Sequence, residues 1–326
     1  MTDAAPSGAE GPQTYGFFLV PRFAMMAFTS AIEPLRAANL LSGRKLYDWR
    51  IISRDGAPVA SSNGTALVAQ ASIESAGKPE NLIVCSGLDA HLFDDRKVLG
   101  WLRDAAHRGA RLGALSDGSF ILARAGLLEG FRCTIHWNCL DSFAETFPEI
   151  EVSAELYRID RKRFTCAGGT AAFDMMLNIL EQDHGRALAV AVAEQYMHDR
   201  IRGDADRQRI SLRLRIGASN PRLLEVIALM EENLELPLSG AELARESGMS
   251  KRQLERLFRR YLGRPPMQYY MELRLQRAHQ LLNNTSMSVL EVGVACGFAS
   301  ASHFAKRYRD LYHHTPRSTR LRPAGA

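Results

Sequence analysis

The chain has 326 residues, of which 46% are hydrophobic and 24% are charged, and its net charge is +5. This length suits two domains, each large enough to bury a core of its own. The sequence contains no run of about 18 apolar residues, so it predicts no membrane-spanning helix. Residues 1–13 lack the basic start and apolar stretch of a signal peptide, which indicates a disordered tail on a cytoplasmic protein. The five scattered cysteines are typical of reduced thiols, and we expect neither a metal nor a cofactor.

Residues 14–198 alternate short apolar runs with helical patterns. The strand-like runs are 15–20, 49–53, 82–85 and 112–115, and the helical patterns are 25–41, 96–107, 120–128, 171–182 and 187–198. A hairpin is expected from residues 157–159 and 163–166, which three polar residues separate. This alternation predicts an α/β domain with a mostly parallel sheet and helical crossovers.

The charged segment 199–220 has little apolar periodicity and ends in Asn-Pro, so we interpret it as a linker. Residues 221–326 then read as a second, all-helical domain. From Lys251 to Arg322 the chain holds 14 Lys and Arg against 4 Asp and Glu. A DNA phosphate backbone is a natural partner for such a segment, although charge alone also fits a solvated basic surface.

An internal repeat is the strongest signal in the second domain. Residues 238–250 match residues 287–299 at a constant offset of 49, and after the turn the offset becomes 50. Ser239 and Ser288 each precede a glutamate by three residues, which is the pattern of a capping box at a helix start. Each repeat therefore reads as a short capped helix, a turn and a second helix.

Small residues occur where two helices of such a unit must turn and cross. Gly248 and Gly297 allow the positive φ of the turn, and Ala244 and Gly293 allow a close crossing. Residues 254, 257, 258 and 261 form an apolar stripe on the following helix, opposite a basic face. An ordinary helical bundle that arose by duplication remains the alternative.

Three motifs carry a resemblance to a known family. They are Ser250-x-Arg252-x-Leu254-x-Arg256-x-Phe258, then Gly263-x-x-Pro266-x-x-Tyr269-x-x-x-x-Arg274-Leu275-x-x-Ala278, and finally Gly297-Phe298-x-Ser300-x-Ser302-His303-Phe304. Together they resemble the AraC-type DNA-binding domain over its length of about 100 residues. The resemblance implies two helix-turn-helix units joined by a long helix near residues 267–282, with both recognition helices in successive major grooves. His313-His314 departs from the family, which usually has a helix-ending glycine there, so the end of the last helix is open.

The resemblance also implies the DNA contacts. Base readers are expected on both recognition helices, and these are Arg252, Glu255 and Arg256 on the first and Ala301, Ser302, His303 and Lys306 on the second. Phosphate contacts are expected from Lys251, Arg259, Arg260 and again Lys306. An arginine such as Arg256 can bind guanine with two hydrogen bonds, whereas Ala301 offers only a methyl group.

The segment Gly113-Ala-Leu-Ser-Asp-Gly-Ser-Phe120 resembles the nucleophile elbow of the ThiJ/PfpI group of class I glutamine amidotransferase-like domains. This implies a flavodoxin-like fold, and the whole chain resembles the GlxA branch of AraC-family regulators. Ser116 stands where catalytic relatives have cysteine, Ala27 falls on the acidic position, and His136 matches the histidine. Because two of the three catalytic groups are replaced, we expect no enzyme and no catalytic residue.

A serine hydrolase or amidotransferase-like enzyme fused to a DNA-binding domain is the alternative. Ala114-x-Ser116-x-Gly118 approximates the Gly-x-Ser-x-Gly elbow, and His136 would be the base. However, the only acids in suitable order, Asp117 and Glu129, are badly placed to orient that histidine. A third interpretation is that Ser116 and His136 are merely polar residues at a turn.

A ligand sensor explains the same elbow better. Free N–H groups at residues 117–119 suit a ligand carboxylate, Trp137 offers an aromatic face to a cation, and Glu33 or Asp117 offers the opposing charge. The expected ligand-binding residues are Glu33, Ser116, Asp117, Gly118, Ser119, His136 and Trp137, although Trp137 also fits a core position. Segment 31–39 resembles regulators of arginine and of glycine betaine or carnitine catabolism, which implies a small zwitterionic effector. The resemblance further implies a ligand-responsive activator that forms a homodimer, binds double-stranded DNA and contacts RNA polymerase.

Overall fold

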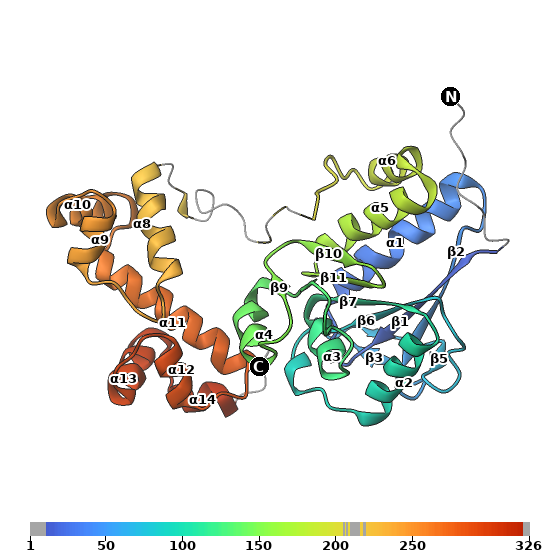
Figure 1. The fold of residues 1–326 in the computed structure, drawn as a ribbon, viewed down its shortest axis with the longest axis horizontal. Helices are drawn as coiled ribbons and strands as arrows, with labels where there is room; N and C mark the ends of the chain where they lie inside the picture. The colour runs from blue at the N-terminus through green and yellow to red at the C-terminus, as the bar shows by residue number, and fades with distance from the viewer. Residues whose placement is uncertain (1–10, 205, 207, 209–215, 218–219, 322–326) are drawn as a thin grey trace. The chain divides into compact units, whose positions relative to one another are not determined.

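The computed structural model describes residues 11–204, 206, 208, 216–217 and 220–321. The chain divides into two compact units, Met1–Gln208 and Arg209–Ala326, an α/β unit and a helical unit (Figure 1). Among the described residues, none of the helices has both the length and the apolar character needed to cross a membrane. All five cysteines are buried free thiols.

The first unit is built on a seven-stranded sheet with the order β10-β11-β7-β6-β1-β2-β5. The strands are β1 (Gln13–Leu19), β2 (Tyr47–Ser53), β5 (Ala71–Ser72), β6 (Asn81–Cys85), β7 (Arg111–Leu115), β10 (Tyr157–Asp160) and β11 (Arg163–Cys166). All neighbours pair in parallel except the β10–β11 hairpin. Every residue of β6 is buried, as expected for a parallel strand covered on both faces. The predicted parallel sheet and hairpin are confirmed.

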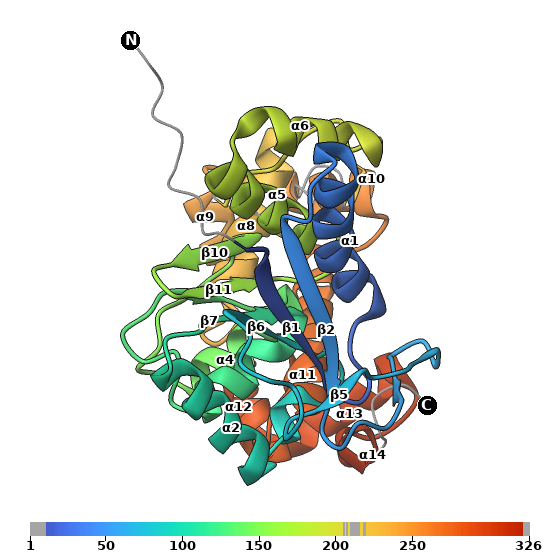
Figure 2. The same cartoon turned by 90° about the vertical axis from the view of Figure 1, so that its right-hand side faces the viewer.

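Helices cover both faces of this sheet (Figure 2). One face packs on α1 (Met25–Ser42), α5 (Ala171–His184) and α6 (Arg186–Gln195). The other face packs on α2 (Arg96–His107), α3 (Ser119–Arg124) and α4 (Leu140–Thr146). Alternate residues of β1 explain the two cores, since Phe17 faces the first helical layer and Phe18 the second.

Short elements fill the connections of the first unit. They are β3 (Val59–Ala60), β4 (Ala66–Leu67), β8 (Cys133–Thr134), β9 (Val152–Ser153), and the 3₁₀ turns η1 (Ala90–Leu92), η2 (Ser116–Gly118) and η3 (Trp137–Cys139). Sequence periodicity did not predict these two- and three-residue pieces or α4, because they are too short to show a period. Helix α3 ends at Arg124, earlier than the predicted 128, because Gly126 takes a left-handed φ of 70°.

The ends of the first unit differ slightly from the ranges read from sequence. Residues 1–10 of the expected tail lie outside the described residues, but Gln13 already belongs to β1. Arg202, Asp206 and Gln208, inside the expected linker, contact the first unit. Leu156 N–H donates to the Asp206 carbonyl at 3.0 Å, and the Gln208 side chain donates to Thr134 Oγ1 at 2.9 Å.

The second unit is helical, and one long helix joins its two halves. Its helices are α8 (Pro221–Glu232), α9 (Gly240–Glu246), α10 (Lys251–Leu262), α11 (Pro266–Asn284), α12 (Val289–Ala295), α13 (Ala301–Tyr312) and α14 (Pro316–Leu321). The first half buries α8, α9 and α10 against Tyr270 at the start of α11. The second half buries α12 and α13 against Leu275 and the residues that follow it in α11.

Candidate functional site

Both helix-turn-helix units begin on the capping boxes that the sequence predicts. Ser239 N–H donates to Glu242 at 2.7 Å, and Glu242 N–H donates to Ser239 Oγ at 3.3 Å. Ser288 and Glu291 repeat this exchange at 2.6 and 3.2 Å. Each box satisfies two backbone donors at a helix start, which fixes where α9 and α12 begin.

The turns of the two units use glycine for the expected reasons. Gly248 and Gly297 have φ values of 63° and 73°, a region that other residues rarely adopt. At Gly293, an added Cβ would lie 3.3 Å from the ring of Phe304, so α12 and α13 cross closely at that point. The predicted close crossing of the two helices in the second helix-turn-helix, α12 and α13, is confirmed.

Helix α10 presents a basic face to solvent. Leu254 and Phe258 are buried in the core beneath it. Four arginines and one lysine are exposed, namely Lys251, Arg252, Arg256, Arg259 and Arg260, while Glu255 is half-buried and lies 3.8 Å from Arg259. Tyr261 does not extend the apolar stripe as expected, because 37% of it is exposed and its hydroxyl accepts a hydrogen bond from Asn220 at 3.4 Å.

Helix α13 presents a smaller and more polar face. Phe304 and Tyr308 are buried beneath it, and the exposed candidates are Ala301, Ser302, His303 and Lys306. Ser300 caps this helix by accepting the His303 N–H at 3.3 Å. At its other end, His313 takes the left-handed conformation with φ of 60°, so α13 ends where relatives would have glycine.

Arg274 on α11 is a structural residue that sequence reasoning did not single out. Its guanidinium donates to the Cys296 carbonyl at 2.8 Å and to the Gly297 carbonyl at 2.6 Å, and it lies 4.3 Å from the ring centre of Phe298. The Arg274 side chain therefore holds the turn between α12 and α13 against the connecting helix α11. The three motifs contained Arg274, but nothing local to α11 indicates partners 22 residues away.

The first unit has a strained elbow at the carboxyl end of β7. Ser116 has a φ of 56° and is only 7% exposed. An added Cβ at Gly118 would lie 2.7 Å from the Val84 carbonyl oxygen, so only glycine lets this turn sit against β6. Gly168 lies over the other side, since a Cβ there would be 2.9 Å from Ser116 Cβ. The strained strand-to-helix turn matches the predicted elbow.

The loop that carries His136 and Trp137 lies beside this elbow. Ser119 Oγ donates to the Thr134 carbonyl at 2.7 Å, and the Cys139 thiol donates to the Asp117 carboxylate. The structure thus brings residues 116–119 next to the segment that contains His136 and Trp137. The Ser119 N–H was expected to be free, but it donates a hydrogen bond to the Asp117 carbonyl.

Electrostatics at the elbow are set by burial. Desolvation raises the pKa of Asp117 to about 7, and its Oδ1 is buried without a hydrogen-bond partner among the described residues. Burial also lowers the pKa of His136, whose Nδ1 accepts the Asn138 N–H at 3.4 Å. The Trp137 ring is 36% exposed and its centre lies 5.5 Å from that of His136.

Glu33 lies in a different setting, in the middle of α1. Its carboxylate accepts hydrogen bonds from Arg36 Nε at 2.8 Å and from the Tyr196 hydroxyl at 2.5 Å. The Arg36 hydrogen bond holds the pKa of Glu33 below its usual value. To serve a ligand, Glu33 would first have to leave this guanidinium. Ala27, on the expected acidic position, is buried in the first turns of α1.

A second group that the sequence did not reveal is the buried Asp174 on α5. Its carboxylate accepts hydrogen bonds from His198 at 2.8 Å and from Arg202, whose Nε and Nη2 lie at 2.9 and 2.6 Å. Arg202 also donates to Thr170 at 2.7 Å, one residue before α5 and directly after the Gly168-Gly169 loop. Arg202, in the segment after α6, is therefore fixed to α5, the helix that begins directly after the Gly168-Gly169 loop beside the elbow.

Comparison with known proteins decides the family. The DJ-1/PfpI family matches residues 17–182 and a helix-turn-helix domain matches residues 243–322. The transcriptional regulator GbdR of Pseudomonas aeruginosa is 45% identical over 97% of this chain and 86% of its own length. The regulator GlxA of Rhizobium meliloti is 38% identical over 98% of this chain and 99% of its own. The chain belongs to the AraC-type transcriptional regulators of the GlxA kind.

Solved structures agree with this assignment. An AraC family regulator from Pseudomonas putida aligns with a TM-score of 0.53 at 32% identity, over 57% of this chain and all of its own. A ThiJ/PfpI family protein from Pseudomonas syringae aligns with a TM-score of 0.52 at 23% identity, over 71% of this chain and 93% of its own, which supports the fold. The predicted fold class, a flavodoxin-like first domain followed by tandem helix-turn-helix units, is confirmed.

The family also decides between regulator and enzyme. The AraC-type relatives are DNA-binding regulators, and this chain is one of them. Within the described part of the chain, the side-chain hydrogen bond of His136 is made with the Asn138 N–H and none joins it to Ser116. The serine-hydrolase alternative requires that hydrogen bond or a close approach to it, together with an acid that orients the histidine.

Proposed function

We propose that this AraC-type regulator is a ligand-responsive activator that senses a small zwitterion at the Ser116 elbow and reads its operator with α10 and α13. It acts in the cytoplasm as a homodimer and contacts RNA polymerase. The observation that carries the proposal is the elbow itself. The strained turn is kept although the thiol and the acid of catalytic relatives are replaced by Ser116 and Ala27, so binding is the output that remains.

The exposed side chains of α10 and α13 support a division into residues that contact bases and residues that contact phosphates. Arg252, Glu255 and Arg256 lie in the first two turns of α10, which is the part of a recognition helix that reaches base edges. Lys251, Arg259 and Arg260 flank them and suit phosphates. On α13, Ala301, Ser302, His303 and Lys306 are exposed in the corresponding turns. Ser302 shares a hydrogen bond with Ser300 at 2.8 Å, so its hydroxyl must rotate to contact a base.

The elbow offers groups for both ends of a zwitterion. Backbone N–H groups at Asp117 and Gly118 suit a carboxylate. Asp117, with its pKa near 7, would donate a hydrogen bond to that carboxylate when protonated and would balance a cation when ionised. The exposed face of Trp137 suits an ammonium or quaternary amine, with His136 beside it. Amino acids and quaternary amines such as arginine, glycine betaine and carnitine combine these groups. Glu33 would join the site only after releasing Arg36.

Calorimetry on the full chain with these three compounds tests the sensor. Trp137→Ala should abolish binding of the effector, because the aromatic face for its cation is removed. Trp49→Phe on β2 is the matched control and should leave affinity unchanged. Ser116→Ala should also keep ligand-dependent transcription in a reporter assay, since the backbone of this turn does the binding. Unchanged affinity in Trp137→Ala would place the effector elsewhere, and esterase turnover lost in Ser116→Ala would favour the hydrolase.

A further inference from the structure

A cationic cleft lies at the amino-terminal ends of the central parallel strands, whereas the elbow lies at their carboxyl ends. The parallel strands β1, β6 and β7 begin at Gln13, Asn81 and Arg111, and Asn81 pairs in register with Arg111. These residues and Lys162, which precedes β11, line a cleft of about 560 Å³ that the end of α2 completes. The elbow occupies the carboxyl ends of the same strands, so the cleft is separate from the proposed effector site.

The lining of this cleft is strongly basic. Lys78, Arg108, Arg111 and Lys162 face a single acid, Glu80. The Glu80 carboxylate already accepts the Thr14 N–H at 2.8 Å and the Thr14 hydroxyl at 3.2 Å. Within the described part of the chain, none of the four cations has an ion-pair partner within 4.0 Å. Four like charges around one concave surface repel one another, and a bound anion would relieve that repulsion.

Asn81 adds an independent sign of a ligand. It is only 2% exposed, and its Oδ1 has no hydrogen-bond partner among the described residues. Its Nδ2 makes one long hydrogen bond of 3.4 Å to the Thr14 carbonyl. A buried acceptor without a donor is rare in folded proteins, because it has lost its water and gained nothing in exchange. Since Oδ1 is an acceptor, the missing partner is a donor such as a hydroxyl group.

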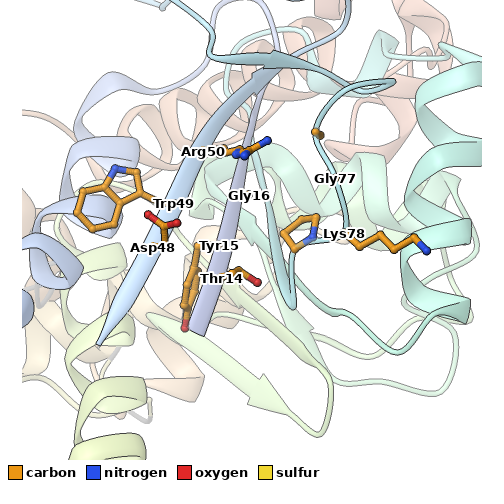
Figure 3. Close-up of a pocket in the computed structure, with 10 residues that line it drawn as sticks. Thr14, Tyr15, Gly16, Asp48, Trp49, Arg50, Gly77 and Lys78 are labelled. Carbon is orange, nitrogen blue, oxygen red and sulfur yellow. The ribbon is translucent and has the colours of Figure 1, made fainter. Parts of the chain in front are cut away.

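A second hollow adjoins the cleft across the loop of residues 77–79. It has a volume of about 210 Å³ and is lined by Thr14, Gly16, Asp48, Arg50 and the loop. Figure 3 shows Arg50 directed toward this loop and Lys78 extending away from the hollow, so the loop separates the two cavities.

We propose that this cleft binds a small phosphorylated metabolite that carries a free hydroxyl group, such as a sugar phosphate. A phosphate offers several oxygens to lysine and arginine donors at once, and its hydroxyl-bearing remainder would donate to Asn81 Oδ1. The volume is that of a site for a small molecule and cannot admit a nucleic acid duplex. This site is a second input beside the proposed effector site and does not depend on it.

Calorimetry on the full chain with ribose 5-phosphate, ribose, inorganic phosphate and citrate tests the proposal. We expect ribose 5-phosphate to bind most tightly, because it supplies both the anion and the donor. Arg108→Ala and Lys78→Ala, both at exposed positions, should each weaken binding by about tenfold or more. Lys97→Ala, an exposed cation at the other end of α2, is the matched control and should bind as the parent does. Asn81→Asp should also lose binding, since it places a negative charge beside the bound phosphate.

Four results would overturn the proposal. They are no binding at millimolar ribose 5-phosphate, equal affinity for citrate, equal weakening by Lys97→Ala, and loss of operator affinity in Arg108→Ala without ligand. The last result would assign the exposed basic side chains at the rim of the cleft to contacts with the DNA backbone. Trp137→Ala should leave phosphate binding intact, so failure at the elbow and failure at the cleft are distinguishable.

Discussion

Two neighbouring residues at the elbow, Ser116 and Asp117, each have a feature that costs folding free energy. Ser116 holds a left-handed backbone that costs a non-glycine residue on the order of 1 kcal/mol or more. Next to it, Asp117 is buried with one oxygen unpartnered among the described residues. Together these residues support the proposal that the turn binds a ligand.

The raised pKa of Asp117 predicts how stability depends on pH. Because burial raises its pKa from 3.8 to about 7, the folded chain holds a proton that the unfolded chain releases across this window. The Asp117 contribution therefore favours folding at low pH and is lost as pH rises, by up to about 1.4 kcal/mol per pH unit between about 4 and 7. Asp117→Asn should flatten this slope and stabilise the first unit above pH 7.

Urea unfolding followed by tryptophan fluorescence measures this, since all three tryptophans lie in the first unit. Asp141→Asn, on the exposed start of α4, is the control and should keep the parental slope. If Asp117→Asn kept the parental slope as well, another group would be responsible and Asp117 would be ionised in the folded chain.

At the scale of elements, the sequence predicted what local patterns determine. The capping boxes at Ser239 and Ser288 and the buried run of β6 lie within a few residues of the signals that specify them. The Asp174 and Arg274 clusters were missed, because their partners lie 22 to 28 residues away and depend on tertiary packing. The expected free N–H at Ser119 was wrong for a related reason, since the 3₁₀ turn consumes it locally.

The two recognition helices end on the same backbone conformation with different residues, which predicts opposite effects of exchange. Gly263 ends α10 with φ of 67°, and His313 ends α13 at the equivalent repeat position with φ of 60°. Glycine adopts this conformation without a Cβ penalty. His313→Gly should therefore stabilise the second unit by roughly 0.5 to 1 kcal/mol, and Gly263→His should destabilise it by a similar amount.

Thermal unfolding of residues 221–326 by circular dichroism measures both changes. His314→Gly serves as the comparison, because His314 lies beside the turn and its Nδ1 is 3.1 Å from Thr319 Oγ1. That variant should lose stability. A destabilised His313→Gly would mean that the histidine side chain contributes more than its backbone conformation costs.

On the scale of the whole molecule, the proposed sensing site and the DNA-binding helices belong to separate units. Each unit has its own buried core, and basic residues concentrate in the second, where 14 Lys and Arg stand against 4 Asp and Glu from Lys251 to Arg322. An effector that binds one state of the protein more tightly than another can shift the equilibrium between them, whereas equal affinity shifts nothing. Asp174 fixes Arg202, and thereby the chain leaving the first unit, to the helix beside the elbow.

Residues 221–326 alone should bind duplex DNA, because the unit has its own core and carries the basic face of α10. Affinity should fall steeply with salt, since phosphate contacts release counterions. Arg256→Ala should cost about 1 to 3 kcal/mol and relax specificity at one base pair, because an arginine on this turn reads a base edge. Arg260→Ala should weaken binding to all sequences alike and reduce the salt dependence, as expected for a phosphate contact.

Fluorescence anisotropy across an operator library at several salt concentrations separates the two effects, with Arg245→Ala on the exposed face of α9 as a control. If Arg256→Ala and Arg260→Ala weakened every sequence equally, α10 would bind only the backbone, and sequence would be read elsewhere.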